Sequence, residues 1–324
     1  MATAPYALEY DGIELCGLSL AGEESYVVLP QLNVAFDFGR APHEVVATEH
    51  VFLTHGHMDH AAGAAYYCAQ RMFIDNPPGH IYAPEPLIEP LRKLLRVWGE
   101  IDGAEPPAHL HAAVPGVDLE VRRDLIVRPF EVSHLCRGRD GRRFAALGFT
   151  LIEVRRKLKV EYQGLLGPQI VALKSKGVEI THRVELPLVT YCGDTGVGPF
   201  LDLDFVRTSK ILLLECTFIE AEHRERARAG NHIHMQDLRD VYPRLANERI
   251  VLMHLTRRTM LSEARKALRE TLGEAALGRV SFLAEHRRRK HAAPPPTAPP
   301  APSMQAAAPN APADESTAKP AAPV

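Results

Sequence analysis

The sequence HGHMDH at residues 55–60 brings three histidines and one aspartate together within six positions. The apolar run EHVFLT at 49–54 precedes it and predicts a buried strand, and the alanine-rich sequence after it favours a helix. A turn from strand to helix can direct these polar side chains into one small volume. A single histidine there would more often be structural, but imidazole and carboxylate groups at this spacing suit zinc and similar divalent ions. The stretch therefore predicts metal ligands at His55, His57, Asp59 and His60.

A site for two metal ions needs more ligands than these four. Candidates are His134, Asp194 and His254, which follow the strand-like runs RPFEVS, LVTYCG and IVLM. Taken alone, Asp194 fits a turn and His254 fits a structural core histidine. Because the carboxyl ends of strands converge at one edge of a sheet, we expect all three at the metal centre.

The rest of the ordered sequence alternates between strand-like and helix-like patterns. Residues 187–192, 210–216 and 249–254 read as buried strands, and residues 263–272 read as a helix. Residues 86–98 also predict a helix, with one apolar face formed by Leu87, Leu91, Leu94, Leu95 and Trp98. This alternation predicts an α/β protein.

Composition limits the class of protein. Of 324 residues, 46% are hydrophobic and 24% are charged, and a net charge of -2 excludes a globally basic binder without excluding a basic face. The five cysteines are widely spread without a CxxC pair, a pattern typical of reduced thiols in a cytosolic protein. The amino terminus makes a poor signal peptide, and no apolar run is long enough to span a bilayer. We therefore expect a cytoplasmic protein with no membrane partner.

The composition changes near the carboxyl terminus. From about Ala292 proline and alanine dominate, and almost nothing large is available for burial. Such a segment cannot offset the entropy cost of ordering. We therefore expect one folded domain over residues 1–290 and a disordered tail over residues 291–324.

The order of the motifs resembles that of the metallo-β-lactamase superfamily. HGHMDH is followed by His134, by CGDTG around Asp194 and by the strand-end His254, while Asp37 resembles the early strand-end aspartate of the superfamily. The resemblance implies an αββα sandwich, in which two mixed β-sheets are flanked by helices.

Further motifs resemble the ribonuclease Z family, endonucleases that trim the 3′ end of precursor tRNA. They are LECTF at 214–218, GNHIH at 230–234 and MHLTRR at 253–258. The stretch from 154 to 181 looks like the short, plant-type form of these enzymes. The resemblance covers about residues 15–275 and implies a zinc-dependent phosphodiester hydrolase.

The resemblance also implies roles for individual residues. The first metal ion would be held by His55, His57 and His134. The second would be held by Asp59, His60 and His254, with Asp194 as the bridge between the two. Zinc is the expected metal, with Mn²⁺ and Fe²⁺ as alternatives.

Three residues would carry the chemistry. Asp59 would orient the attacking water, and Glu215 with His232 would protonate the leaving ribose oxygen, a task that suits imidazole near neutral pH. The spacing to His254 favours His232 over His234, which we expect to cap or flank a helix.

The resemblance further implies precursor tRNA or another structured RNA as the partner, and a homodimer. Two features depart from the family: the loop at 135–143 is longer and more basic, and the arm-like insertion near 154–182 is short. Basic residues in both segments could contact phosphates, which would favour recognition of folded shape over base sequence.

Two other classes of function fit the same scaffold. Another hydrolase, such as a phosphodiesterase, thioesterase or lactonase, would share the ligands but would not need Glu215 and His232 as a relay. A non-catalytic metal-binding or RNA-binding module is disfavoured because all seven ligand positions are filled.

Overall fold

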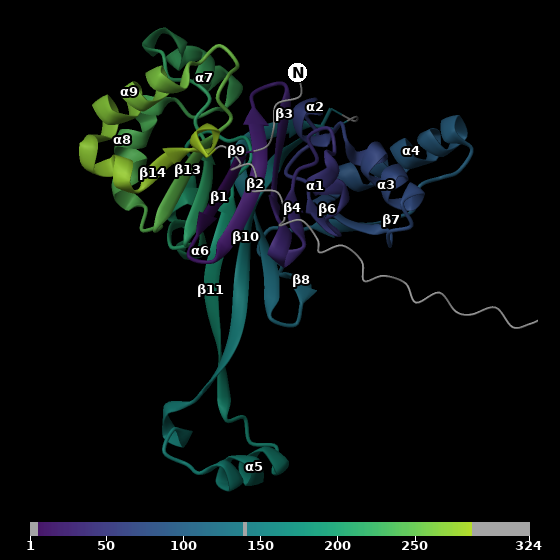
Figure 1. Cartoon of the computed structure of the whole chain (residues 1–324), viewed down its shortest axis with the longest axis vertical. Helices are drawn as coiled ribbons and strands as arrows, with labels where there is room; N and C mark the ends of the chain where they lie inside the picture. The colour runs from purple at the N-terminus through teal and green to yellow at the C-terminus, as the bar shows by residue number, and fades with distance from the viewer. Residues whose placement is uncertain (1–5, 139–140, 287–324) are drawn as a thin grey trace, which may run out of the picture. The chain divides into compact units, whose positions relative to one another are not determined.

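Two seven-stranded sheets pack face to face in the computed structural model, which describes residues 6–138 and 141–286 (Figure 1). Helices cover the outer face of each sheet, so the predicted αββα sandwich is confirmed. The tail expected over residues 291–324 lies outside the described residues. Within the described ranges, no helix has both the length and the apolar character needed to span a bilayer.

The first sheet is antiparallel from β1 to β4 and parallel from β4 to β7. Its strands, in spatial and chain order, are β1 (Tyr6–Tyr10), β2 (Ile13–Leu20), β3 (Glu24–Leu29), β4 (Val34–Phe36), β5 (His50–Phe52), β6 (Gly79–Pro84) and β7 (Ala108–Ala113). Its outer face packs against three helices, α1 (His43–Val46), α3 (Ala64–Phe73) and α4 (Glu85–Asp102). A short helix, α2 (Met58–Ala61), begins within the HGHMDH motif.

The second sheet repeats this plan, antiparallel from β8 to β11 and parallel from β11 to β14. Its strands are β8 (Leu119–Arg122), β9 (Leu125–Arg137), β10 (Arg143–Leu158), β11 (Thr181–Tyr191), β12 (Ile211–Glu215), β13 (Arg249–Met253) and β14 (Val280–Phe282). The helices packed on its outer face are α6 (Asp204–Arg207), α8 (Leu238–Val241) and α9 (Leu261–Leu272), and α7 (Arg224–Gly230) lies in the connection between β12 and β13.

Short 3-10 helices fill several connections. They are η1 (Pro30–Leu32), η2 (Val160–Tyr162), η3 (Pro199–Asp202), η4 (Ala221–His223), η5 (Met235–Asp237), η6 (Tyr242–Arg244), η7 (Glu274–Gly278) and η8 (Leu283–Glu285).

The core between the sheets explains why the central strands are so apolar. The ILLLE sequence of β12 is fully buried because one face meets the opposite sheet and the other meets helices. Aromatic rings from both sheets meet in this layer, with Phe36 and Tyr191 stacked at a centroid distance of 5.1 Å. The strand predictions over residues 187–192, 210–216 and 249–254 all fall on this second sheet and are confirmed.

Two expectations about local structure were wrong. In α4, Leu91 and Leu95 are buried as predicted, but Leu94 is 40% exposed because it lies about 100° around the helix from Leu95. His134 was expected to follow a strand, yet β9 continues through it to Arg137. A register shift between β9 and β10 accompanies this position, and such a bulge can re-aim a side chain without ending a strand.

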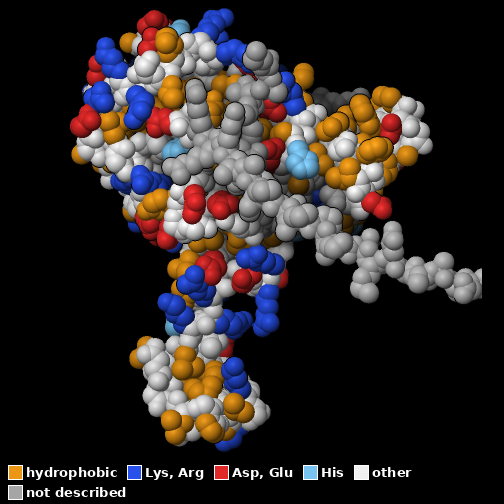
Figure 2. Space-filling model, in the orientation of Figure 1, with side chains coloured by type: hydrophobic (Ala, Val, Ile, Leu, Met, Phe, Trp, Pro, Cys, Tyr) orange, Lys and Arg blue, Asp and Glu red, His pale blue; other side chains and the backbone are white. Residues whose placement is uncertain are grey.

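The insertion near residues 154–182 is a two-stranded arm. The paired ends of β10 and β11 carry it outward, with pairing continuing to Leu158 opposite Thr181 (Figure 1). Its far end holds η2 and α5 (Gly167–Ser175). Figure 2 shows lysine and arginine side chains along the stalk and hydrophobic side chains toward the end.

The base of the arm is fixed by an ionic network around Arg128 of β9. Its Nε donates to Asp118 at 2.7 Å and its Nη1 to Glu185 of β11 at 3.0 Å. The Arg128 side chain is only 20% exposed, so solvent screens these contacts incompletely. We expect Arg128→Ala to lower the free energy of unfolding by about 1–2 kcal/mol, measured by urea denaturation. Arg122→Ala, which breaks an exposed pair with Asp124, should change it by less than about 0.5 kcal/mol.

The contribution of this network to the free energy of unfolding should decrease at acidic pH. Hydrogen bonds from Arg128 hold the pKa of Asp118 below its ordinary value, against the opposing effect of burial. A lowered pKa in the folded state stabilises the fold above the ordinary carboxyl pKa, and this contribution is lost as pH falls through the lowered value. The difference between wild type and Arg128→Ala should therefore shrink in acid, and a difference that grew in acid would contradict this account.

Candidate metal centre

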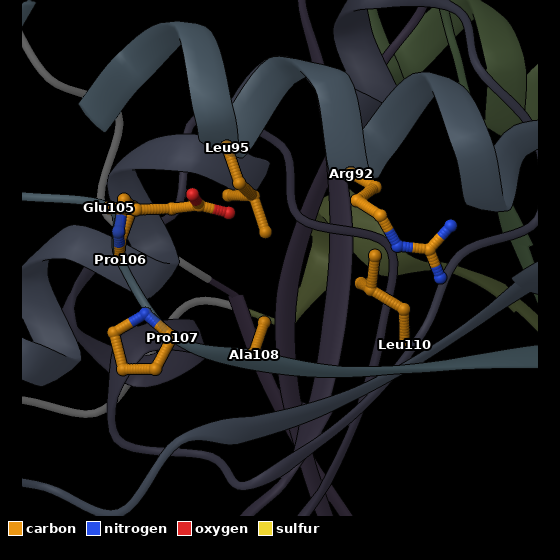
Figure 3. Close-up of a pocket in the computed structure, with 7 residues that line it drawn as sticks. All are labelled: Arg92, Leu95, Glu105, Pro106, Pro107, Ala108 and Leu110. Carbon is orange, nitrogen blue, oxygen red and sulfur yellow. The ribbon is translucent and has the colours of Figure 1, made fainter. Parts of the chain in front are cut away.

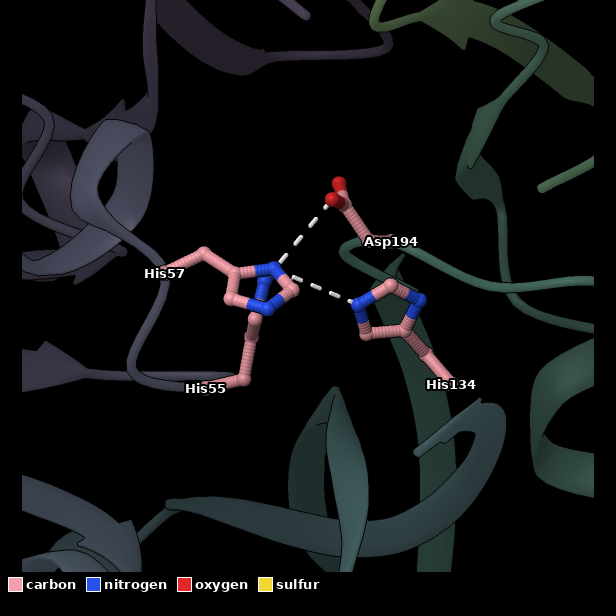
Figure 4. Close-up of side chains that lie close together, drawn as sticks. All are labelled: His55, His57, His134 and Asp194. Atoms are coloured by element: carbon pink, nitrogen blue, oxygen red, sulfur yellow. Dashed lines mark hydrogen bonds and ion pairs between the residues drawn. The ribbon is translucent and has the colours of Figure 1, made fainter. Parts of the chain in front are cut away.

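The predicted ligands meet at the carboxyl ends of strands from both sheets. His55 follows β5, and His57 stands at the amino end of α2. Asp194 follows β11, and His254 follows β13. Figure 4 shows His55, His57, His134 and Asp194 pointing toward one another from opposite sides of the sandwich.

Four side chains form a first cluster, and their ligand atoms lie within 4.8 Å of one another. His57 Nδ1 is 3.4 Å from His134 Nε2, and His55 Nε2 is 3.7 Å from Asp194 Oδ2. Three imidazoles and one carboxylate are a donor set that suits zinc.

A second cluster lies on the other side of Asp194. Its Oδ1 is 3.1 Å from His60 Nε2 and 3.2 Å from His254 Nε2, and Asp59 Oδ2 is 3.4 Å from His254 Nε2. Asp194 therefore offers one oxygen to each cluster. The structure brings all seven predicted ligands into these two groups.

Partners behind the ligands fix the histidine rings. Four of the histidines direct Nδ1 away from the clusters, toward Thr54 Oγ1 for His55 (2.9 Å), Asp37 Oδ2 for His60 (2.6 Å), Thr217 Oγ1 for His254 (3.0 Å) and the Asn231 carbonyl for His134 (3.4 Å). Each threonine hydroxyl donates to a carboxylate, Thr54 to Asp37 and Thr217 to Glu215, and so accepts from its histidine. These bonds place the Nδ1 proton outward and leave the Nε2 lone pair facing the cluster.

Backbone turns at the strand ends aim several of these side chains. Asp37 and His254 have backbone φ angles of +57° and +62°, values that residues other than glycine rarely adopt. Gly193 has φ of +59°, and a Cβ there would come within 2.8 Å of the Thr54 side chain. Such strain persists where surrounding structure imposes it, as at functional sites.

The clusters contain buried polar atoms that lack a hydrogen-bond partner among the described residues. They are His55 Nε2, His60 Nε2 and Asp194 Oδ1. Burial lowers the pKa of His55 well below its ordinary value, which leaves a neutral imidazole. Burial favours the neutral form of Asp194, yet His254 and His60 hold its pKa well below the ordinary value. Burial opposes a charge on His60, yet the carboxylates of Asp194 and Asp37 raise its pKa well above the ordinary value, so a bound cation would take the place of that proton. Imidazoles beside an ionised carboxylate fit divalent cations, so the residues present match the expected metals.

Glu215 and His232 form a pair beside the second cluster. Glu215 is fully buried, and its Oε1 accepts from His232 Nδ1 at 2.6 Å and from the Thr195 N–H at 2.8 Å. Its Oε2 accepts from the Thr217 hydroxyl at 2.6 Å. Burial would lower the pKa of His232, but the hydrogen bond and charge of Glu215 raise it above the ordinary value. The arrangement can hold a proton on His232 near the metal ligands.

His234 lies outside this group. It is fully buried, with Nε2 bonded to the Glu220 carbonyl at 2.9 Å and Nδ1 accepting from the Gln236 N–H at 3.2 Å. It therefore caps η5, the helix-flanking position expected from the sequence.

Comparisons with known proteins agree with this geometry. The chain is 31% identical to tRNase Z TRZ1 of Arabidopsis thaliana over 283 residues, which cover 86% of this chain and 98% of that protein. The chain belongs to the tRNase Z family. No protein-family model matches the sequence.

Solved structures show the same fold at low sequence identity. The metallo-β-lactamase fold protein YhfI from Bacillus subtilis has a TM-score of 0.56 and 14% identity, over 82% of this chain and 93% of that one. The short form of human tRNase Z has a TM-score of 0.52 and 18% identity, over 75% of this chain and 93% of that one.

The tRNase Z site opens into a cleft of about 450 Å³. Its lining includes His57, Asp59 and His232 together with Arg226 and Arg258. A second cleft of about 310 Å³, bounded by Ser133, Asn231 and Arg228, shares His232 with the first. His232 thus lines both clefts.

A third cavity lies elsewhere. It holds about 390 Å³ between α4 and β7, with Arg92, Leu95 and Glu105 among its walls (Figure 3). It shares no lining residue with the cleft of the candidate metal centre.

Sequence reasoning missed the residues that orient the ligands of this tRNase Z. Thr54, Thr217 and Asn231 contact His55, His254 and His134. Sequence position could have indicated this role for the two threonines, since Thr54 directly precedes the histidine motif and Thr217 follows Glu215 by two residues.

Proposed function

We propose that this chain is a metal-dependent endoribonuclease that removes the 3′ trailer from precursor tRNA. The observation that carries the proposal is the Glu215–His232 pair, held at 2.6 Å beside two ligand clusters that share Asp194. Phosphodiester hydrolysis with an alkoxide leaving group needs such a proton donor. The names of the family relatives support RNA as the substrate.

Two divalent ions would be held by the clusters, zinc in our proposal and Mn²⁺ or Fe²⁺ as alternatives. When bound, they would activate water and neutralise charge on the reacting phosphate. Asp59 receives the Gly22 N–H on Oδ2 at 2.9 Å, which holds its carboxylate toward the cleft, where it orients the attacking water and takes its proton.

His232 acts on the other side of the phosphate. Its proton passes to the 3′ oxygen that leaves with the tRNA body, and Glu215 stabilises the imidazolium and fixes the ring through Nδ1. The hydrogen bond from Thr217 ties the same carboxylate to His254, so one buried acid orients both the relay and a metal ligand.

Binding of RNA would use arginines that line the cleft and basic residues of the arm. Arg226 and Arg258 line the cleft, and Lys157 lies on the arm stalk, where Figure 2 shows a gathering of basic side chains. Contacts from such groups to phosphates give sequence-independent affinity that weakens with salt. A homodimer, a cytoplasmic location and a domain boundary near residue 290 belong to the same proposal and rest on the sequence.

The test is cleavage of a 3′-extended precursor tRNA by zinc-loaded protein. We expect a single cut that leaves a 3′ hydroxyl on the tRNA and a 5′ phosphate on the trailer. Hydrolysis of a thioester or a lactone without cleavage of any RNA would reject the nuclease in favour of another hydrolase on this fold.

A further inference from the structure

Four histidines gather on one face of the first sheet. They are His50 of β5, His80 of β6, and His109 and His111 of β7. His50, His80 and His109 are direct neighbours in the parallel register. Their ring centroids are separated by 5.1 Å from His50 to His80 and by 4.6 Å from His80 to His109. We call this group the histidine ladder.

The closest pair lies diagonally across β6 and β7. His80 Nδ1 is 3.0 Å from His111 Nε2, and the planes of the two rings differ by 9°. A carboxylate stands on the other side, with Glu49 Oε1 at 4.0 Å from His80 Nε2. His109 is two residues from His111 on the same face of β7, and the His80 ring lies against both, directly opposite His109 and diagonal to His111.

The ladder is partly open to solvent. The His80 side chain is 30% exposed and that of Glu49 is 38% exposed. Burial lowers the pKa of His80 and His111 below the ordinary value. At neutral pH these rings are therefore uncharged and carry lone pairs.

The ladder is separate from the metal centre. His50 begins β5, whereas His55 follows that strand at its opposite end. Five residues of extended chain span about 16 Å at roughly 3.3 Å per residue. None of the residues in the two ligand clusters belongs to the ladder.

We propose that the histidine ladder binds one further divalent transition ion of the class that prefers imidazole, such as Zn²⁺, Ni²⁺ or Cu²⁺. Two nitrogens bound to one ion at about 2.0–2.1 Å lie roughly 3 Å apart, which is the separation already present between His80 and His111. A rotation of the rings turns both lone pairs to one point. His109 completes the site by side-chain rotation, with water in the remaining positions, while Glu49 faces the opposite nitrogen of His80 and supports the ring from behind.

The test counts zinc ions on the full chain. Protein with its catalytic clusters loaded is dialysed against stepped free Zn²⁺ and its metal content is measured. The key variant is His80→Phe/His111→Phe, which keeps the stacked rings and removes the ligand nitrogens. The control is His43→Phe, at an exposed histidine on α1. We expect wild type and control to bind one zinc more than the double variant, with equal RNA cleavage by all three.

A second measurement, the thermal unfolding midpoint with and without added zinc, separates loss of the proposed site from misfolding of a variant. Zn²⁺ should raise the midpoint of thermal unfolding of the loaded wild type, because an ion that binds only the folded state stabilises it. The single variant His111→Phe, at the edge strand, should bind the added zinc at least about tenfold more weakly. Equal zinc content and equal thermal shifts in wild type and variants would show that the ladder is only a packed aromatic surface.

Discussion

His232→Ala should lower the rate of precursor tRNA cleavage by about 10²–10⁴-fold, the usual cost of removing a general acid. The variant should still bind both proposed ions, because His232 directs Nδ1 to Glu215 and lies outside the two clusters that share Asp194. Single-turnover cleavage with excess enzyme measures the chemical step, and elemental analysis measures the ions.

A second substrate separates the relay from general damage. Bis(p-nitrophenyl) phosphate releases nitrophenolate, which needs no proton, so His232→Ala should affect it much less. The matched control is His223→Ala, since His223 also lines the cleft but pairs with Glu220 at 3.1 Å and not with Glu215. Equal losses on the two substrates, or a larger effect of His223→Ala, would remove His232 from this role.

The two clusters of candidate metal ligands could be located from the sequence because most of their residues directly follow apolar, strand-like runs. HGHMDH follows an apolar run, and Asp194 and His254 follow others, so parallel strand ends bring them together. His134 differs from the other ligands, because it joins the first cluster from within β9, at a register shift, and not from the end of a strand. Hydrophobic pattern does not encode such a shift, which depends on how two long strands pair in three dimensions.

The supporting residues were harder to predict for a related reason. Thr217 connects Glu215 to His254 through one hydroxyl, and the three come from two strand ends that neighbour each other only in the folded sheet. Threonine is common in strands, so nothing in its type marks it as a link. For the arm, the sequence predicted the position of the insertion. Only the structure shows that β10 and β11 stay paired as far as Leu158 and Thr181.

Asp194→Asn should cause the largest loss of activity of any single change considered. The substitution keeps the size of the side chain and removes the negative charge that faces His60 and His254 at 3.1 and 3.2 Å. Because Asp194 offers an oxygen to both clusters, both should lose affinity for metal. The cleavage rate should fall by more than the roughly 10²–10⁴-fold expected for loss of one general acid, and on both substrates.

The measurements are zinc content after dialysis and cleavage at saturating zinc. Asp124→Asn is the matched control, since Asp124 is exposed and pairs only with Arg122 among the ion pairs of the described residues. It should keep wild-type zinc content and rate. An Asp194→Asn protein that folds, retains two zinc ions and cleaves precursor tRNA would show that the two clusters do not depend on a shared carboxylate. The loss predicted for Asp194→Asn differs in kind from that of His232→Ala, because it removes the ions together with the chemistry and so spares neither substrate.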